Sequence, residues 1–307
     1  MTSRRAGRRT GRPGIAPRLP AGPVPISTGV AEVVLAPDRH LATLLVNGVP
    51  SSCLGLDDPT WLEFEYHQQM AAVVDRMAPG PLRAIHLGAG ACSFPRWVDA
   101  VRPGSRQLAV DVDASLVELV RRWFDLPRAP ALRLRAQDAR ETLASLPGGS
   151  ADLVVRDVFD GDKTPADLLI AETARAVGRT LRPHGLYLVN CADSPPLPRA
   201  RAEVATLRAA LGPVLVVAET AVMRGRRYGN LVLAAGGEHA IESLDLSALQ
   251  RRLRSLPVPA RLLDPAEAAD FAGSAAVLRA EPGPVPPGPV ALAGHDEAAP
   301  PGDAARS

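Results

Sequence analysis

The stretch that decides the fold is RAIHLGAGACSFPRWVDAVRPGSRQLAVDVD, residues 83–113. An apolar run at 84–87 ends in the Gly-Ala-Gly of residues 88–90, a helical pattern follows, and a second apolar run at 107–110 ends at Asp111. Two apolar runs joined through a helix indicate parallel strands in one sheet. Glycine lets the backbone turn sharply and approach a ligand, and the helix after it offers free backbone amides.

The same alternation continues along the chain. Further strand-like runs lie at 132–135, 152–155, 185–189, 214–218 and 230–234. Helical stretches separate the first six strands, whereas a Gly/Arg turn without a helix joins the last two. This pattern predicts an α/β methyltransferase-like Rossmann fold, with a seven-stranded, mostly parallel sheet that ends in an antiparallel hairpin. Two closing helices are expected at 245–255 and 264–272. Ser93 stands where a dinucleotide fingerprint has its third glycine, which argues against NAD.

A smaller unit precedes this domain. Residues 30–53 contain short β-rich runs, and Asn47-Gly48 between apolar segments is a strong hairpin signal because both residues tolerate positive φ. Asp58-Pro59 is expected to open a helix that runs to about Met77. We therefore predict a β-hairpin unit with a linking helix over 26–80 and the Rossmann domain over 81–280.

Composition separates the ends from the body. The 307 residues are 46% apolar and carry a formal charge of +2, but residues 1–25 hold six arginines and no acid, while residues 281–307 are acidic. The near-neutral middle excludes a strongly basic nucleic-acid-binding body. Both ends are rich in proline and lack hydrophobic periodicity, so we predict disordered tails at 1–25 and 281–307. No run of about 18 apolar residues occurs and no continuous apolar stretch follows the basic N-terminus, so we expect neither a membrane span nor a secretory signal. The three distant cysteines favour a reduced, cytoplasmic protein.

Acidic side chains follow the predicted strands. Asp111 lies 21 residues after Gly90, at the spacing where a carboxylate accepts the hydroxyls of a nucleoside ribose. Asp138 is placed to bind an adenine amino group, to cap the next helix, or both. Asp157 and Asp160 follow the fourth strand, where clustered carboxylates can hold a cationic amine and accept its proton, with mutual repulsion raising one pKa. The alternatives are turn or cap residues and a solvated acidic loop. No metal-ligand spacing is present.

In combination, these runs resemble the spermidine synthase (polyamine aminopropyltransferase) family, most closely the spermidine synthase-like proteins common in actinobacteria. The resemblance covers about residues 30–236. Its matching segments are LVNGV at 45–49, DPTWLEFEY at 58–66, and the runs at 86–96, 108–113, 137–140, 152–165, 181–193 and 224–233.

The resemblance implies a sulfonium co-substrate, either S-adenosylmethionine or its decarboxylated form, and a small-molecule amine acceptor, in a family where dimers are common. By position, Gly88 and Gly90 line the co-substrate, Asp111 holds the ribose and Asp138 the adenine. Asp157 matches the acid that accepts the amine proton. Asp160 matches its amine-binding partner, and Tyr66 is a candidate orienter.

The sequence also departs from the family. Ala91 replaces an aspartate of the glycine loop, Pro50-Ser51 replaces a glutamine of the hairpin, and Gln68 replaces a glutamate. Three hypotheses follow: aminopropyl transfer from decarboxylated S-adenosylmethionine to an amine, methyl transfer from the intact form to an unknown small molecule, or nucleoside binding with weakened catalysis. No membrane or nucleic-acid partner is expected.

Several other side chains are weighed against ordinary structural roles. Asp193 is either a further acceptor or a turn residue, and His67 belongs either to the site or to the surface. We interpret His86 as a core residue. Cys92 sits at a helix start, which can lower a thiol pKa. The basic turn at 224–227 fits an anion contact or a solvated hairpin tip.

Overall fold

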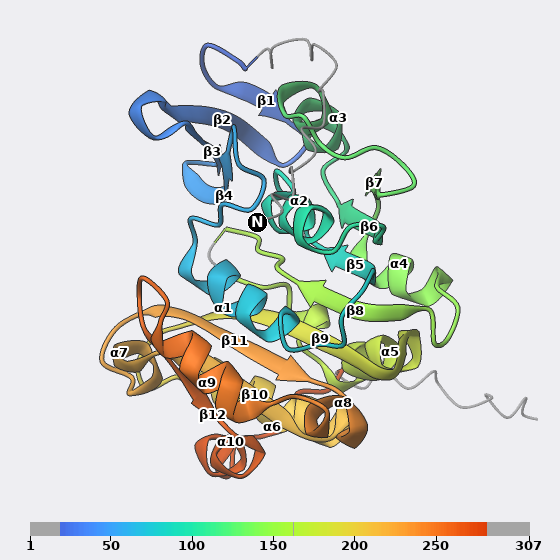
Figure 1. Cartoon of the computed structure of the whole chain (residues 1–307), viewed down its shortest axis with the longest axis vertical. Helices are drawn as coiled ribbons and strands as arrows, with labels where there is room; N and C mark the ends of the chain where they lie inside the picture. Colours follow the sequence, from blue (N-terminus) through green and yellow to red (C-terminus); the bar gives the residue numbers. More distant parts are fainter. Residues whose placement is uncertain (1–18, 162, 281–307) are drawn as a thin grey trace, which may run out of the picture.

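The computed structural model describes residues 19–161 and 163–280, which form two sheets (Figure 1). The N-terminal sheet is antiparallel throughout, in the order β1-β2-β3-β4. Its strands are β1 (Val24–Ile26), β2 (Gly29–Ala36), β3 (Leu41–Val46) and β4 (Val49–Gly55), with the short 3-10 helix η1 (Pro37–Arg39) after β2. Asn47 and Gly48 turn between β3 and β4 with φ of 51° and 78°, so the predicted hairpin is present within a larger sheet.

Within the described residues the main sheet has eight strands in the order β12-β10-β11-β9-β8-β5-β6-β7. They are β5 (Arg83–Leu87), β6 (Arg106–Asp111), β7 (Leu132–Ala136), β8 (Ala151–Arg156), β9 (Leu181–Asp193), β10 (Val214–Glu219), β11 (Gly229–Ala235) and β12 (Ala260–Leu263). Strands β7, β6, β5, β8 and β9 are parallel, and β11, β10 and β12 add antiparallel pairs at one edge. The predicted fold class is confirmed.

The count of seven strands was wrong by one. Strand β12 is only four residues long and pairs with β10, more than 40 positions earlier in the chain, so no local sequence pattern predicts it. A four-residue helix, α7 (Thr220–Met223), also lies between β10 and β11, where a plain turn was expected.

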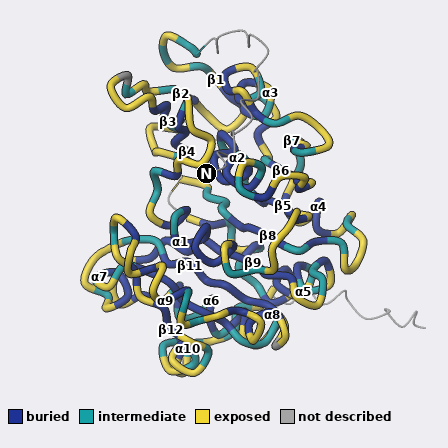
Figure 2. Tube along the Cα trace, in the orientation of Figure 1, coloured by how far each residue is buried: buried dark blue, intermediate teal, exposed yellow. Residues whose placement is uncertain are grey.

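Helices cover both faces of the main sheet, and Figure 2 shows its strands buried between them. The helices are α1 (Glu65–Val74), α2 (Ser93–Val101), α3 (Ala114–Trp123), α4 (Ala139–Ser145), η2 (Ala166–Leu168), α5 (Ala171–Thr180), α6 (Pro198–Leu211), α8 (Glu238–Glu242), α9 (Leu246–Arg254) and α10 (Pro265–Ala272). One core cluster contains α1, α2, α8 and α9, and the other contains α4, α5, α6 and α10. Alternate residues of β8 enter opposite clusters, as in a sheet buried on both faces (Leu153 and Val154).

The N-terminal sheet shares a third cluster with α3, which fixes it against the carboxyl ends of the parallel strands. Helix α1 begins at Glu65, later than predicted, because Asp58 instead closes a local turn with Thr60, whose N–H and hydroxyl both donate to its carboxylate. Strand β1 begins at Val24, inside the predicted tail 1–25. Residues 1–18 and the predicted tail 281–307 lie outside the described residues. In the part of the chain that is described, no helix has the length and apolarity to cross a bilayer.

Candidate active site

The glycine turn after β5 is built for close backbone contact. Gly88 has φ of +86°, and a Cβ there would lie 2.1 Å from the carbonyl oxygen of Asp157. Gly90 has φ of +46°, and its Cβ would lie 2.5 Å from the Ser52 hydroxyl. A side chain at Gly88 would clash with backbone, and one at Gly90 would displace the Ser52 side chain. The Ala91 N–H donates to the same Ser52 hydroxyl at 2.9 Å, so β4 of the N-terminal sheet closes directly over the turn.

Asp111, at the end of β6, ties that turn to the neighbouring strand. Its Oδ2 accepts from the N–H groups of Ala89 (3.3 Å) and Gly90 (3.2 Å), and its Oδ1 accepts from Asp113 (3.1 Å). Burial raises the pKa of Asp111 more than these bonds lower it. Asp113 caps α3 through the N–H of Leu116, as predicted.

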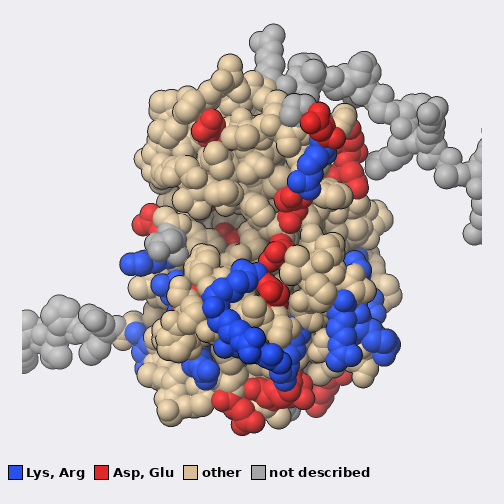
Figure 3. Space-filling view, turned by 90° about the vertical axis from the view of Figure 1, so that its left-hand side faces the viewer, with Lys and Arg blue, Asp and Glu red and all other residues tan. Residues whose placement is uncertain are grey.

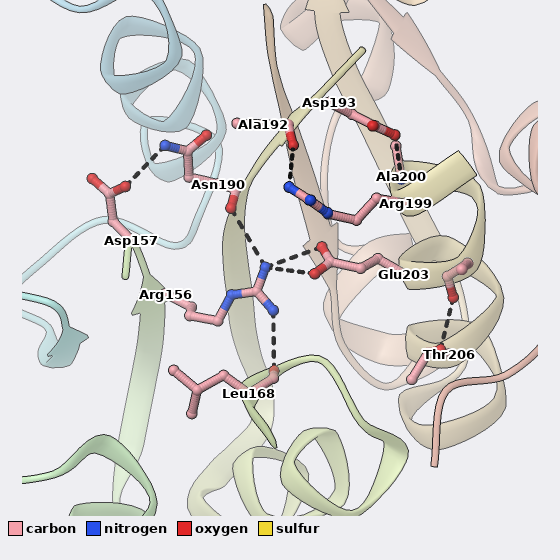
Figure 4. Close-up of polar contacts among 11 residues, drawn as sticks. Arg156, Asp157, Leu168, Asn190, Ala192, Asp193, Arg199, Ala200, Glu203 and Thr206 are labelled. Atoms are coloured by element: carbon pink, nitrogen blue, oxygen red, sulfur yellow. Dashed lines mark hydrogen bonds and ion pairs between the residues drawn. The ribbon is translucent and has the colours of Figure 1, made fainter. Parts of the chain in front are cut away.

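Asp157 follows β8, and three side chains from two other elements bond to its carboxylate. Its Oδ2 accepts from the Tyr66 hydroxyl (2.9 Å) and from Nε2 of His67 (3.2 Å), both on α1. Its Oδ1 accepts from the side-chain amide of Asn190, in the last third of β9, at 2.8 Å (Figure 4). The side chain is 16% exposed. Figure 4 shows the Asn190 amide pointing directly at this carboxylate.

The electrostatics of Asp157 run against the expectation of a raised pKa. Burial pushes its pKa up, but the hydrogen bond and charge of His67, with the bonds from Asn190 and Tyr66, outweigh burial and leave the pKa below its ordinary value. Burial and the adjacent carboxylate raise the pKa of Tyr66 well above 10.0. Asp157 is therefore held as an anion by donors, and repulsion between clustered acids does not set its pKa.

The two remaining aspartates are more open. Asp138 is exposed and caps α4, accepting at Oδ1 from the N–H groups of Arg140 (2.7 Å) and Glu141 (3.0 Å), so the predicted cap role is confirmed. Asp160 is exposed in the loop after β8, where its backbone pairs with that of Lys163.

A cavity of about 600 Å³ brings the candidate residues together between the N-terminal sheet, α1 and the strand ends. Figure 3 shows the molecule hollowed across its middle, with acidic atoms inside the hollow. All seven residues that the sequence nominated line the cavity: Tyr66, Gly88, Gly90, Asp111, Asp138, Asp157 and Asp160. Its described lining contains five aspartates, with Asp167 as the fifth, and neither lysine nor arginine.

Other residues that the sequence singled out take structural roles. Asp193 accepts from the N–H groups of Ser194 and Ala200 and so ties β9 to the start of α6. His86 is buried, donates to Gln107 at 2.9 Å, and has its pKa lowered to about 4 by burial, although its ring also borders the cavity. Burial raises the pKa of the Cys92 thiol to about 12, the reverse of what a nucleophile needs. Arg227, in the basic turn, pairs with Glu219.

The residues that depart from the family pattern lie in different parts of the structure. Ala91 is fully buried in the cluster shared with the N-terminal sheet and does not line the cavity. Gln68 turns back to donate to the carbonyl of Leu62. Pro50 and Ser51, by contrast, do line the cavity.

Sequence reasoning left His67 undecided and did not single out Asn190 or Ser52. The available signal for Asn190 was a polar residue directly after the apolar run at 185–189, well inside the strand that the structure extends to Asp193.

No family model matches the chain. A probable spermidine synthase from Corynebacterium glutamicum ATCC 13032 superposes with a TM-score of 0.78 at 33% identity, over 87% of this chain and 98% of that one. The chain belongs to the spermidine synthase family.

Curated relatives extend the comparison of this spermidine synthase-family protein. Polyamine aminopropyltransferase of Neisseria meningitidis (strain MC58) is 26% identical over 168 residues, 54% of this chain and 64% of the relative's length. The human eEF1A lysine and N-terminal methyltransferase is 26% identical over 155 residues, 44% of this chain and 22% of that protein.

Proposed function

We propose that this spermidine synthase-family protein transfers an aminopropyl group from decarboxylated S-adenosylmethionine to a small-molecule amine. The observation that carries the proposal is Asp157, held as an anion by three donors in a cavity whose described lining has five aspartates and no lysine or arginine. Such a cavity attracts cations and concentrates them at the strand ends.

Charge separates the two sulfonium donors. Decarboxylated S-adenosylmethionine carries a sulfonium and an ammonium, whereas the intact form also carries a carboxylate. Burying a carboxylate without a partner is costly, and the described lining offers aspartates where a cation would be needed. The cavity therefore fits the decarboxylated donor better than the intact one.

The co-substrate is held by the turn and strand ends. The backbone at Gly88 and Gly90 has no side chain in the way, and Val112, 69% exposed beside Asp111, offers an apolar surface to a base. We assign the ribose to Asp111. Its bonds to backbone amides are long, at 3.1–3.3 Å, and ribose hydroxyls compete for the same oxygens because O–H···O⁻ bonds contract to about 2.5–2.7 Å. We assign the adenine amino group to Asp138.

Transfer is an in-line displacement. The amine nitrogen attacks the methylene carbon on sulfur, a C–N bond forms, the C–S bond breaks, and its electron pair stays on sulfur as a neutral thioether. The leaving group needs no acid, so the protein's task is to present an unprotonated nitrogen in line. An ionised carboxylate has about four acceptor sites, and three are taken at Asp157, which leaves one on Oδ1 for an amine N–H. Tyr66 bonds to the other oxygen of Asp157, and Asp160 lines the same cavity.

The lowered pKa defines what Asp157 does with the proton. An alkylammonium and a carboxylic acid of ordinary pKa differ by about 6.5 units, so resting the amine proton on Asp157 costs about 9 kcal/mol. Losing that proton to water at pH 7 costs about 5 kcal/mol, because the pKa of the alkylammonium lies only about 3.4 units above the pH. Asp157 therefore binds and orients the amine and accepts its proton only in passage to solvent. The rate should rise with pH through the neutral range.

One experiment tests the function. The purified protein is incubated with each sulfonium donor and a panel of amines, and mass spectrometry measures methylthioadenosine and S-adenosylhomocysteine. Methylthioadenosine that requires both the decarboxylated donor and an amine is the expected result. S-adenosylhomocysteine from the intact donor would instead identify a methyltransferase, and donor binding without either product would indicate nucleoside binding with weakened catalysis.

A further inference from the structure

A buried ion pair lies directly behind the candidate site (Figure 4). Arg156 is the last residue of β8, next to Asp157, and Glu203 lies on α6. Nη2 of Arg156 donates to Oε1 and Oε2 of Glu203 at 2.8 and 3.0 Å. The side chains are only 3% and 2% exposed.

Stability does not explain this pair. Removing two charges from water costs several kcal/mol for each ion, and apolar replacements of buried pairs are often neutral or stabilising. Arg156 Nε is buried without a hydrogen-bond partner in the described part of the chain, which adds to that cost. A costly pair beside a candidate site calls for another role.

The guanidinium joins three segments that meet at the cavity. Its Nη1 donates at 3.1 Å to the carbonyl of Leu168, the last residue of η2, which follows the loop that carries Asp160. Its Nη2 also lies 3.4 Å from the carbonyl of Asn190, and Glu203 anchors the group to α6. Asn190 then donates from its side chain to Asp157, which is the chain neighbour of Arg156. A planar group with several donors in fixed directions suits this task, and a single ammonium does not.

We propose that Arg156 and Glu203 are positioning residues, which fix Asn190 and the loop after β8 so that the Asn190 amide stays on the Asp157 carboxylate. Neither reaches the cavity lining. The inference rests on the proposed function for its catalytic consequence, whereas its structural content concerns only Asn190 and Asp157.

The test replaces both members at once, Arg156→Leu with Glu203→Leu, which keeps the net charge and avoids an unpaired buried ion. The first readout needs no substrate: the Asp157 carboxyl is titrated by carbon-13 NMR in selectively labelled protein. Tyr66 and His67 face the same carboxylate and are unchanged. The pKa of Asp157 should rise as much as it does in Asn190→Ala, with no further rise when the three changes are combined. A pKa equal to that of the wild type would overturn the proposal.

The second readout is kinetic. With the decarboxylated donor and an amine, kcat of the double variant should fall about 10- to 100-fold, the effect of a misplaced reacting group, while the KM for the donor stays unchanged. Asn190→Ala should lower kcat similarly, and the effects should not add. A shifted pKa of Asp157 with unchanged kcat would refute the catalytic role.

If the wild type transfers no aminopropyl group, the proposed function fails, and the titration still decides the positioning role. Should the double variant not fold, Arg156→Lys replaces it. This change keeps the positive charge but not the three hydrogen-bond directions, so the pKa of Asp157 should rise by a smaller amount.

Discussion

Replacing Asp157 with asparagine isolates the charge of the site from its shape. The new amide oxygen can keep the bonds from Tyr66 and His67, but its NH₂ group would then face the Asn190 NH₂ at the present 2.8 Å contact. Asn190 Oδ1 is buried without a partner within the described residues, so a flip of the Asn190 amide turns that clash into a hydrogen bond. We therefore expect Asp157→Asn to fold and to lose mainly the negative charge.

The magnitude follows from the single acceptor position left on Asp157. A hydrogen bond to a charged group is worth about 1.5–3 kcal/mol, so losing the carboxylate should lower kcat/KM for the amine by a factor of about 10 to 150. The KM for the sulfonium donor should change less than about twofold, because the proposed donor site at Asp111 and the glycine turn is built without the Asp157 side chain.

The assay is the initial rate of methylthioadenosine formation, with each substrate varied in turn. Asp270→Asn is the matched control, since Asp270 is exposed on α10 and outside the cavity lining, and it should leave both constants unchanged. A kcat/KM for the amine within twofold of the wild type would refute the role given to Asp157. So would an equal loss in binding of the donor, because that would mean the substitution had deformed the whole cavity.

Three further changes test the turn, the covering sheet and the core. Gly88→Ala drives a Cβ to 2.1 Å from a backbone oxygen and should abolish turnover and lower the melting temperature, whereas Gly149→Ala, also at positive φ but with nothing within 4 Å, should keep activity. Ser52→Ala removes the acceptor of the Ala91 N–H and should raise the KM of the donor several-fold; an unchanged KM would show that β4 does not brace the turn. The pKa of His86 is about 4 in the folded protein and 6.5 in the unfolded chain, so the unfolded chain binds more protons between these two values. The free energy of unfolding should therefore fall by about 3 kcal/mol in total as the pH is lowered from 6.5 to 4. Chemical denaturation across that pH range measures the loss, which His86→Gln should largely remove.

The sequence predicted the parallel core of the fold because its strands are buried on both faces and read as continuous apolar runs. Strand β8, with Leu153 and Val154 facing opposite clusters, is typical. The same reasoning missed β12, whose partner is distant in the chain, and began α1 too early at Asp58, whose carboxylate bonds only to the turn at Thr60. Local sequence patterns therefore predict only those elements that contacts between neighbouring residues determine.

The aspartates of the site were found from sequence for a similar reason. Parallel strands end at one edge, so acids that follow several strands must gather there. The partners that set their chemistry were not accessible in this way. Tyr66 and His67 reach Asp157 across 91 and 90 positions, and Asn190 across 33, so only the packing of α1 and β9 shows that donors hold the carboxylate ionised.

Ala91 shows why a missing family residue must be placed in space before it is weighed. As a sequence departure, the loss of an aspartate from the glycine loop implied a weaker hold on a cationic substrate. In the structure Ala91 is fully buried among apolar side chains, its own N–H donates to the Ser52 hydroxyl, and it does not line the cavity. An aspartate there would be a carboxylate buried among apolar groups. The five aspartates of the cavity lie instead at the end of β6 and in the segments that follow β7 and β8, and Asp157 is the one fixed by donors from two other elements. The loop of this chain bonds to the N-terminal sheet through Ser52, and the cation capture proposed above depends on the aspartates at the strand ends.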